Sequence, residues 1–177
     1  MTTPVWIPWL VLAAVAAQRV AELIVARRNT ARLLARGAVE VGAAHYPLIV
    51  AVHVLWLIAV AIWIGLVRPS VAPAWLMAYI LLQGLRAWVL VTLGAYWTTR
   101  IITLPNAPLV TRGPYRFMRH PNYAVVVGEI AALPLVFGSW QIALVFSLLN
   151  AAVLCVRLRA ENAALMPRRD TPVQLSL

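Results

Sequence analysis

The chain of 177 residues is 63% hydrophobic and 11% charged, with a mean hydropathy of +0.86. Soluble domains are about 45–50% apolar and about 25% charged, so an ordinary soluble enzyme, a disordered tail and a disulfide scaffold are poor interpretations. All 15 basic residues are arginine, against 5 acidic residues. Nucleic-acid binders share this imbalance but are rarely so apolar, so a membrane protein without a nucleic-acid partner is favoured.

The first predicted membrane-spanning helix covers residues 4–26, which can cross about 30 Å of hydrocarbon. A cleaved signal peptide is the alternative, but no basic segment precedes the run and polar residues interrupt it. A loop is predicted next, beginning with Arg27 and Arg28. Four further spans are predicted at 46–67, 73–97, 123–137 and 139–156. The fourth is short, so we expect it to lie tilted or to stop before the far interface.

The arginines indicate the orientation of the chain. Twelve of them fall on one side of the membrane if the N-terminus is outside, and they come in three groups: Arg27, Arg28, Arg32 and Arg36; Arg100, Arg112, Arg116 and Arg119; Arg157, Arg159, Arg168 and Arg169. Arg68 alone falls on the other side. The positive-inside rule therefore predicts an all-α, polytopic protein of the inner or plasma membrane, one domain over 1–177, with a cytoplasmic tail at 157–177.

Charged residues inside the predicted spans are candidates for function, because a charge at membrane depth is costly unless it is paired or hydrated. Near the inner end of the first span lie Gln18, Arg19 and Glu22. Arg19 and Glu22 share a helix face, so a structural ion pair between them is predicted. The alternative is that the Arg19 side chain extends to the membrane interface. Two later spans also carry charged residues: Arg86, which is near Gln83, and Glu129. A second ion pair is predicted between Arg86 and Glu129. Both Arg86 and Glu129 are candidate substrate-binding residues.

The histidines and the cysteine do not indicate a metal centre. His45 and His53 are eight residues apart with no carboxylate in their segment, so hydrogen-bonded packing is favoured over a metal site. Cys155 is the one cysteine of the chain, which excludes an intrachain disulfide and a cysteine-based zinc site. It lies in an apolar run and is expected to be a buried structural thiol.

The least apolar stretch, 98–122, is rich in proline and glycine and is predicted to be a loop. Its end packs arginines, a histidine and tyrosines into the segment Gly113-Pro114-Tyr115-Arg116-Phe117-Met118-Arg119-His120-Pro121-Asn122-Tyr123. Arginine binds carboxylates with two parallel hydrogen bonds, and tyrosine faces hold flat or cationic groups. A loop that only anchors the protein does not need this combination, so a ligand site is the favoured interpretation.

Gly113-Pro114-Tyr115-Arg116 followed by Arg119-His120-Pro121-Asn122-Tyr123 resembles the signature of the isoprenylcysteine carboxyl methyltransferase family. These are integral-membrane enzymes that use S-adenosylmethionine. A second family element, an arginine followed by an acidic pair, matches Arg157 and Glu161, whereas Asn162 replaces the second acid. The resemblance covers residues 75–165. Within the family, the chain is most similar to a short bacterial branch, with the branch features His45-Tyr46, Trp97-Thr98-Thr99-Arg100-Ile101-Ile102 and Leu148-Leu149-Asn150-Ala151.

The resemblance implies a cofactor site in the loop and the following helices. His120, Pro121 and Tyr123 would line it, Glu161 would close it, and its shape would come from Gly113, Pro114, Tyr115 and Arg119. No Gly-x-Gly loop follows a strand, so a soluble dinucleotide-type fold is excluded. His120 or Glu161 would remove a proton from the acceptor where one must leave. Arg157 would hold an anionic nucleophile, with Arg86 reaching the same cavity.

The branch is associated with type III polyketide synthases, which implies O-methylation of an alkylpyrone or alkylresorcinol whose tail enters sideways from the membrane. Three alternatives stay open: a prenylcysteine carboxylate as acceptor, N-methylation of a phospholipid headgroup, and a small channel, transport or assembly subunit. A channel predicts polar residues along several spans, whereas here they gather at the cytoplasmic ends. The expected partners are therefore a lipophilic acceptor and membrane lipids, and the oligomeric state is left open.

Overall fold

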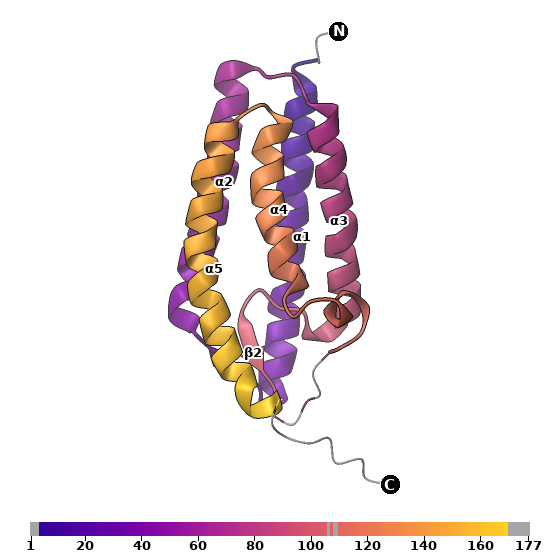
Figure 1. Ribbon diagram of the computed structural model, residues 1–177, viewed down its shortest axis with the longest axis vertical. Coiled ribbons are helices and arrows are strands. Elements are labelled where there is room, and N and C mark those ends of the chain that lie inside the picture. Colours follow the sequence, from indigo (N-terminus) through magenta and orange to yellow (C-terminus); the bar gives the residue numbers. More distant parts are fainter. Residues whose placement is uncertain (1–3, 106, 108–109, 170–177) are drawn as a thin grey trace.

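The computed structural model describes residues 4–105, 107 and 110–169, and for residues 165–169 it describes the backbone alone. Five α-helices make up the bundle: α1 (Trp6–Ala35), α2 (Tyr46–Val67), α3 (Pro73–Leu93), α4 (Pro121–Val136) and α5 (Trp140–Arg169). Three short 3-10 helices, η1 (Ala43–His45), η2 (Gly94–Tyr96) and η3 (Gly113–Arg116), lie in the connections. The predicted all-α, polytopic membrane fold is confirmed (Figure 1).

In the described chain, four helices are long and apolar enough to cross a membrane, namely α1, α2, α3 and α5. The remaining helix, α4, has 16 residues, so the fourth predicted span is indeed short. It lies between α3 and α5 and packs against both (Figure 1). The start of α1 and the end of α5 lie at opposite ends of the bundle.

Two predicted boundaries are wrong. The loop expected from Arg27 begins only after Ala35, because arginine is a good helix former and no glycine or proline lies between Arg27 and Gly37. Gly37 then adopts a φ of 85°, a conformation that glycine tolerates best. Similarly, α5 continues through the first part of the predicted tail, to Arg169.

An element that the sequence analysis did not predict is a two-stranded antiparallel ribbon. It pairs β1 (Val39–Val41) with β2 (Ile101–Thr103), with Val39 opposite Thr103. A side-chain ion pair joins the strands, because Arg100 Nη1, just before β2, lies 2.8 Å from Glu40 Oε1. The ribbon lies at the end of the bundle where α5 ends (Figure 1), and it ties the connection after α1 to the connection after α3.

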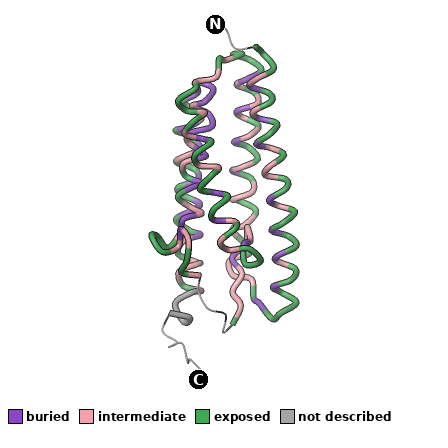
Figure 2. The backbone as a smooth tube through the Cα atoms, turned by 90° about the vertical axis from the view of Figure 1, so that its right-hand side faces the viewer, coloured by how far each residue is buried: buried purple, intermediate pink, exposed green. Residues whose placement is uncertain are grey.

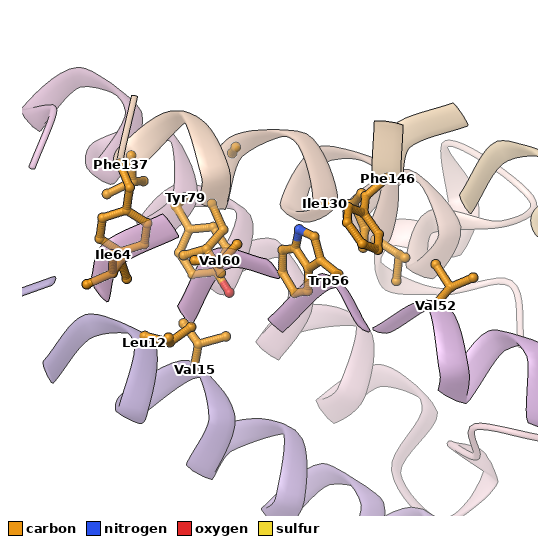
Figure 3. Close-up of a cluster of buried hydrophobic side chains, with 14 of the residues drawn as sticks. Leu12, Val15, Val52, Trp56, Val60, Ile64, Tyr79, Ile130, Phe137 and Phe146 are labelled. Atoms are coloured by element: carbon orange, nitrogen blue, oxygen red, sulfur yellow. The ribbon is translucent and has the colours of Figure 1, made fainter. Parts of the chain in front are cut away.

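The apolar core lies along one face of α2. Val52, Trp56, Val60 and Ile64 follow each other at intervals of four residues, so they point in one direction, and each is at most 6% exposed. Figure 3 shows these side chains together with Ile130 of α4 and Phe146 of α5. The core therefore holds α4 and α5 against α2.

The outer surface of the bundle is apolar as well. Figure 2 shows exposed residues along the outer faces of the helices, and Leu66 and Val91 are each 80% exposed. Such surfaces are expected where helices face lipid instead of water. Cys155 belongs to this outer surface, which corrects the prediction of a buried thiol. It follows Leu154, which is buried, so Cys155 lies on the outward side of α5.

Candidate active site

The turn before α4 is built by a glycine and two prolines. Gly113 has a φ of 60°, and a Cβ atom there would lie 2.5 Å from Oγ1 of Thr92 in α3. Pro114, which follows, is buried in η3. Pro121 is buried too and occupies the first turn of α4, where the missing N–H of proline costs nothing. The turn therefore packs tightly on the end of α3 and directs His120 and Tyr123 towards α5.

Tyr123, Arg157 and Glu161 form a hydrogen-bonded chain between α4 and α5. The Tyr123 hydroxyl donates a hydrogen bond to the Glu161 carboxylate. Arg157 Nε donates to the same hydroxyl oxygen at 2.7 Å, and its Nη2 donates to the carbonyl oxygen of Thr99 at 2.7 Å. Arg157 and Glu161 are four residues apart on α5, so they share one face of that helix.

His120 lies beside this chain. Its ring stacks on Tyr123, with the centroids 5.4 Å apart and an interplanar angle of 22°. Its Nε2 atom lies 3.2 Å from Asn162 Oδ1, and Nδ1 lies 3.7 Å from Glu161 Oε1. The asparagine that replaces the second acid of the family pattern is therefore in contact with the histidine of the loop.

A cavity of about 320 Å³ opens beside these residues. We call it the loop cavity, because residues of the segment 98–123 form most of its wall. Its chemically distinctive lining residues are Tyr115, Arg119, His120, Tyr123, Arg157 and Glu161. Burial raises the pKa of the Tyr115 hydroxyl well above its ordinary value, and the Glu161 carboxylate raises it further.

A second cavity, of about 170 Å³, lies among the helices, and we call it the helix cavity. Its apolar wall consists of Leu23, Ile49, Val50, Val54, Leu57, Val126 and Leu154. Arg19, Glu22, His53 and Arg86 add a polar region. Four residues line both cavities, namely Thr98, Asn122, Tyr123 and Arg157. The two cavities therefore adjoin, and we call these four residues the shared wall.

The polar region of the helix cavity belongs to a buried network. Arg86 donates from Nε to Glu22 at 2.6 Å and from Nη1 to Glu129 at 2.9 Å. Arg19 contacts the same two carboxylates, at 3.1 Å and 2.9 Å. Both predicted pairs, Arg19–Glu22 and Arg86–Glu129, are thus confirmed. Two guanidinium groups face two carboxylates, so the charges of this cluster balance.

Two glutamines complete the network. Gln18 donates to Glu22 at 2.9 Å and to Gln83 at 2.7 Å, and Gln83 donates to Glu129 at 2.8 Å. The six side chains come from α1, α3 and α4. Because each ion is paired and hydrogen-bonded, the charges are tolerated in a low-dielectric interior.

The predicted site residues fall into three groups in the described part of the chain. Tyr115, Arg119, His120, Tyr123, Arg157 and Glu161 all line the loop cavity. Gly113, Pro114 and Pro121 line neither cavity and shape the turn instead. Arg86 lines the helix cavity, and Glu129, which is 1% exposed, lies behind it.

His53, expected to be hydrogen-bonded within the helical core, has its partner in its own helix. Nδ1 of His53 lies 2.9 Å from the carbonyl oxygen of Ile49, one turn earlier in α2. No group of three or more potential metal ligands of the His, Cys, Asp or Glu type is found among the described residues.

Sequence reasoning missed the residues that hold the segment after α3. Asn29 of α1 donates to the carbonyl oxygen of Trp97 at 2.8 Å. The Tyr46 hydroxyl lies 3.0 Å from Thr99 Oγ1, and the Arg100 guanidinium lies 4.5 Å from the centre of the Tyr46 ring. No sequence signal distinguished Asn29, because it lies among Arg27, Arg28 and Arg32, and the other contacts depend on the unpredicted ribbon.

The chain is similar to known proteins over most of its length. Residues 75–167 match the model of the isoprenylcysteine carboxyl methyltransferase (ICMT) family. The chain is 42% identical over 160 residues to the uncharacterized protein YpbQ of Bacillus subtilis, covering 89% of this chain and 95% of that protein. It is 26% identical over 160 residues to an uncharacterized protein of Haemophilus influenzae, covering 88% and 93%. No solved structure matches the chain significantly.

Proposed function

Because the chain belongs to the isoprenylcysteine carboxyl methyltransferase family and is therefore an integral-membrane methyltransferase, we propose that it moves a methyl group from S-adenosylmethionine to an oxygen atom of a lipophilic acceptor. The observation that carries this proposal is the pair of adjoining cavities. A polar cavity next to an apolar one suits a reaction between a water-soluble donor and a membrane-dissolved acceptor.

The loop cavity fits the methyl donor in size and chemistry. Its volume of about 320 Å³ is within the range of small-molecule sites. Arg119 suits the carboxylate of the donor, Glu161 suits a cationic group, and the Tyr115 and Tyr123 rings suit flat or sulfonium groups. When bound, the donor supplies an electrophilic methyl group on sulfur. The chain's own part is to orient that group towards the shared wall and to exclude water.

The helix cavity fits the acceptor. Its apolar residues suit a lipid tail, and Arg157 in the shared wall suits an electron-rich or anionic oxygen. The proposed acceptor is a phenolic lipid of the alkylpyrone or alkylresorcinol type, with a prenylcysteine carboxylate as the second candidate. A phenol must lose its proton during transfer, and His120 and Glu161 are the proposed bases, since both line the loop cavity.

The proposed orientation places the N-terminus outside, with the C-terminus and both ligand sites towards the cytoplasm. The arginines of the α1 end, of the 98–122 segment and of the α5 end support it, because positive residues prefer the cytoplasmic side. This arrangement gives the loop cavity access to a cytoplasmic cofactor. It also leaves the polar head of the acceptor near the inner interface.

Calorimetry on the detergent-purified protein tests the cofactor site. Saturable binding of S-adenosylhomocysteine is expected, and His120→Ala should abolish it because the ring lies in the cavity wall against Tyr123 and Asn162. His45→Ala is the matched control, since η1 lies outside both cavities. Unchanged affinity in His120→Ala removes this residue from the site. No binding by the folded wild-type protein contradicts the proposal.

The acceptor is tested with labelled S-adenosylmethionine and three defined probes. These are a long-chain alkylresorcinol, a long-chain alkylpyrone and N-acetyl-S-farnesylcysteine. Labelled product from either of the first two supports the phenolic lipid class, whereas product from the third alone supports the prenylcysteine carboxylate. Label found in a phospholipid amine instead contradicts O-methylation.

A further inference from the structure

The positions of the two candidate bases raise a geometric problem for a hydroxyl acceptor. His120 and Glu161 line the loop cavity, but neither is among the lining residues of the helix cavity. The acceptor is placed in the helix cavity by the proposed function, on which this inference rests. A proton that leaves the acceptor therefore has to cross the shared wall before it reaches either base.

Of the four shared-wall residues, Tyr123 is suited to carry that proton. A guanidinium such as Arg157 has no acceptor atom and does not deprotonate in proteins, and the carboxamide of Asn122 is not a proton carrier. The Thr98 hydroxyl can both donate and accept, but it donates to the carbonyl oxygen of Arg100 at 2.7 Å, which is not a base. The Tyr123 hydroxyl instead donates to a carboxylate, that of Glu161.

We propose that the Tyr123 hydroxyl is a catalytic proton relay between a hydroxyl acceptor in the helix cavity and Glu161. The ring is held on one side by the stacked imidazole of His120. The Arg157 guanidinium lies 5.6 Å from the ring centre and donates from Nε to the hydroxyl oxygen. These contacts fix the direction of the O–H bond towards Glu161 and leave acceptor capacity on the oxygen for a ligand hydroxyl.

The step conserves atoms and charge. The acceptor oxygen forms its bond to the methyl carbon as the bond from that carbon to sulfur breaks, and sulfur keeps the electron pair as a thioether. The acceptor proton passes to the Tyr123 oxygen while the tyrosine's own proton passes to Glu161. Tyr123 ends neutral and Glu161 ends protonated. Arg157 stabilises negative charge that develops on the tyrosine oxygen, and the Glu161 side chain, 25% exposed, can release its proton to water.

Tyr123→Phe tests the relay, because it keeps the stacked ring and removes the hydroxyl. An alkylresorcinol must lose a phenolic proton, whereas the acidic enol of an alkylpyrone is already ionised near neutral pH. We expect the turnover of the alkylresorcinol to fall by about 10²–10⁴-fold, the range of general acid–base catalysis, and that of the alkylpyrone to change far less. The affinity for S-adenosylhomocysteine, measured by calorimetry, should stay within a small factor of the wild type.

The pH dependence gives an independent readout. The difference in alkylresorcinol turnover between Tyr123→Phe and the wild type should shrink as the pH approaches the phenolic pKa of about 10, because the acceptor then ionises without help. Tyr115→Phe is the matched control. This tyrosine lines the loop cavity but not the helix cavity, so any loss should be the same for both acceptors and independent of pH.

Three results overturn the relay. The first is that Tyr123→Phe loses turnover equally on both acceptors. The second is that this variant loses no turnover on the alkylresorcinol. The third is that the wild-type enzyme methylates the ionised alkylpyrone alone. These outcomes leave the proposed function standing, because methyl transfer is still observed. If the wild type methylates neither lipid, the proposed acceptor class fails together with the relay.

Discussion

Arg86 of α3 donates a hydrogen bond of 2.9 Å to Glu129 of α4, and the two residues are 7% and 1% exposed. The same guanidinium also binds Glu22 of α1. One side chain thus connects three helices through two buried carboxylates, directly beside the helix cavity. This relationship makes Arg86 a structural residue as well as part of the cavity wall.

Arg86→Met should therefore strongly destabilise the protein. It leaves two buried carboxylates with a single guanidinium, that of Arg19, and breaking a buried pair in this way costs about 3–5 kcal/mol. The measurement is thermal unfolding in detergent. Arg100→Ala is the control. The Arg100 side chain, which pairs with Glu40, is 41% exposed, and exposed ion pairs contribute about 0–1 kcal/mol to stability. Equal shifts of the unfolding temperature in both variants would contradict the prediction.

Gly113→Ala should weaken cofactor binding. The new Cβ would lie 2.5 Å from Thr92 Oγ1, and a φ of 60° is unfavourable for alanine. The turn that carries His120 into the loop cavity must then shift. Gly37→Ala has the same kind of backbone problem, with a φ of 85°, but nothing lies within 4 Å of its Cβ position. Calorimetry with S-adenosylhomocysteine should show a larger loss of affinity for Gly113→Ala, and equal affinities would refute the steric argument.

Labelling with a membrane-impermeant maleimide tests the orientation in intact cells. In a Cys155→Ser background, a cysteine at Ser70, between α2 and α3, should be labelled from outside. A cysteine at Arg36, at the end of α1, should be labelled only after lysis, because it lies at the opposite end of the bundle. The reverse pattern would place the N-terminus inside and would move both cavities to the other face.

The sequence by itself determined the membrane fold, the family and the chemically distinctive residues of the loop cavity. Long apolar runs have few other stable solutions in lipid, since every backbone group must be satisfied within a helix. The Gly-Pro and His-Pro turns also predict locally how the loop re-enters the bundle. The resemblance to the family, and not the turns, named His120, Tyr123, Arg157 and Glu161 as neighbours before the structure placed them together.

The tertiary structure decided what depends on contacts between distant segments. It added the ribbon that joins Glu40 to Arg100, the second carboxylate beneath Arg86, and the division of the site into two cavities. Sequence periodicity gives the face of a helix on which a residue lies, but not which other helix covers that face. The placement of Tyr123 between two cavities, with its hydroxyl directed at Glu161, follows only from how α4 packs on α5.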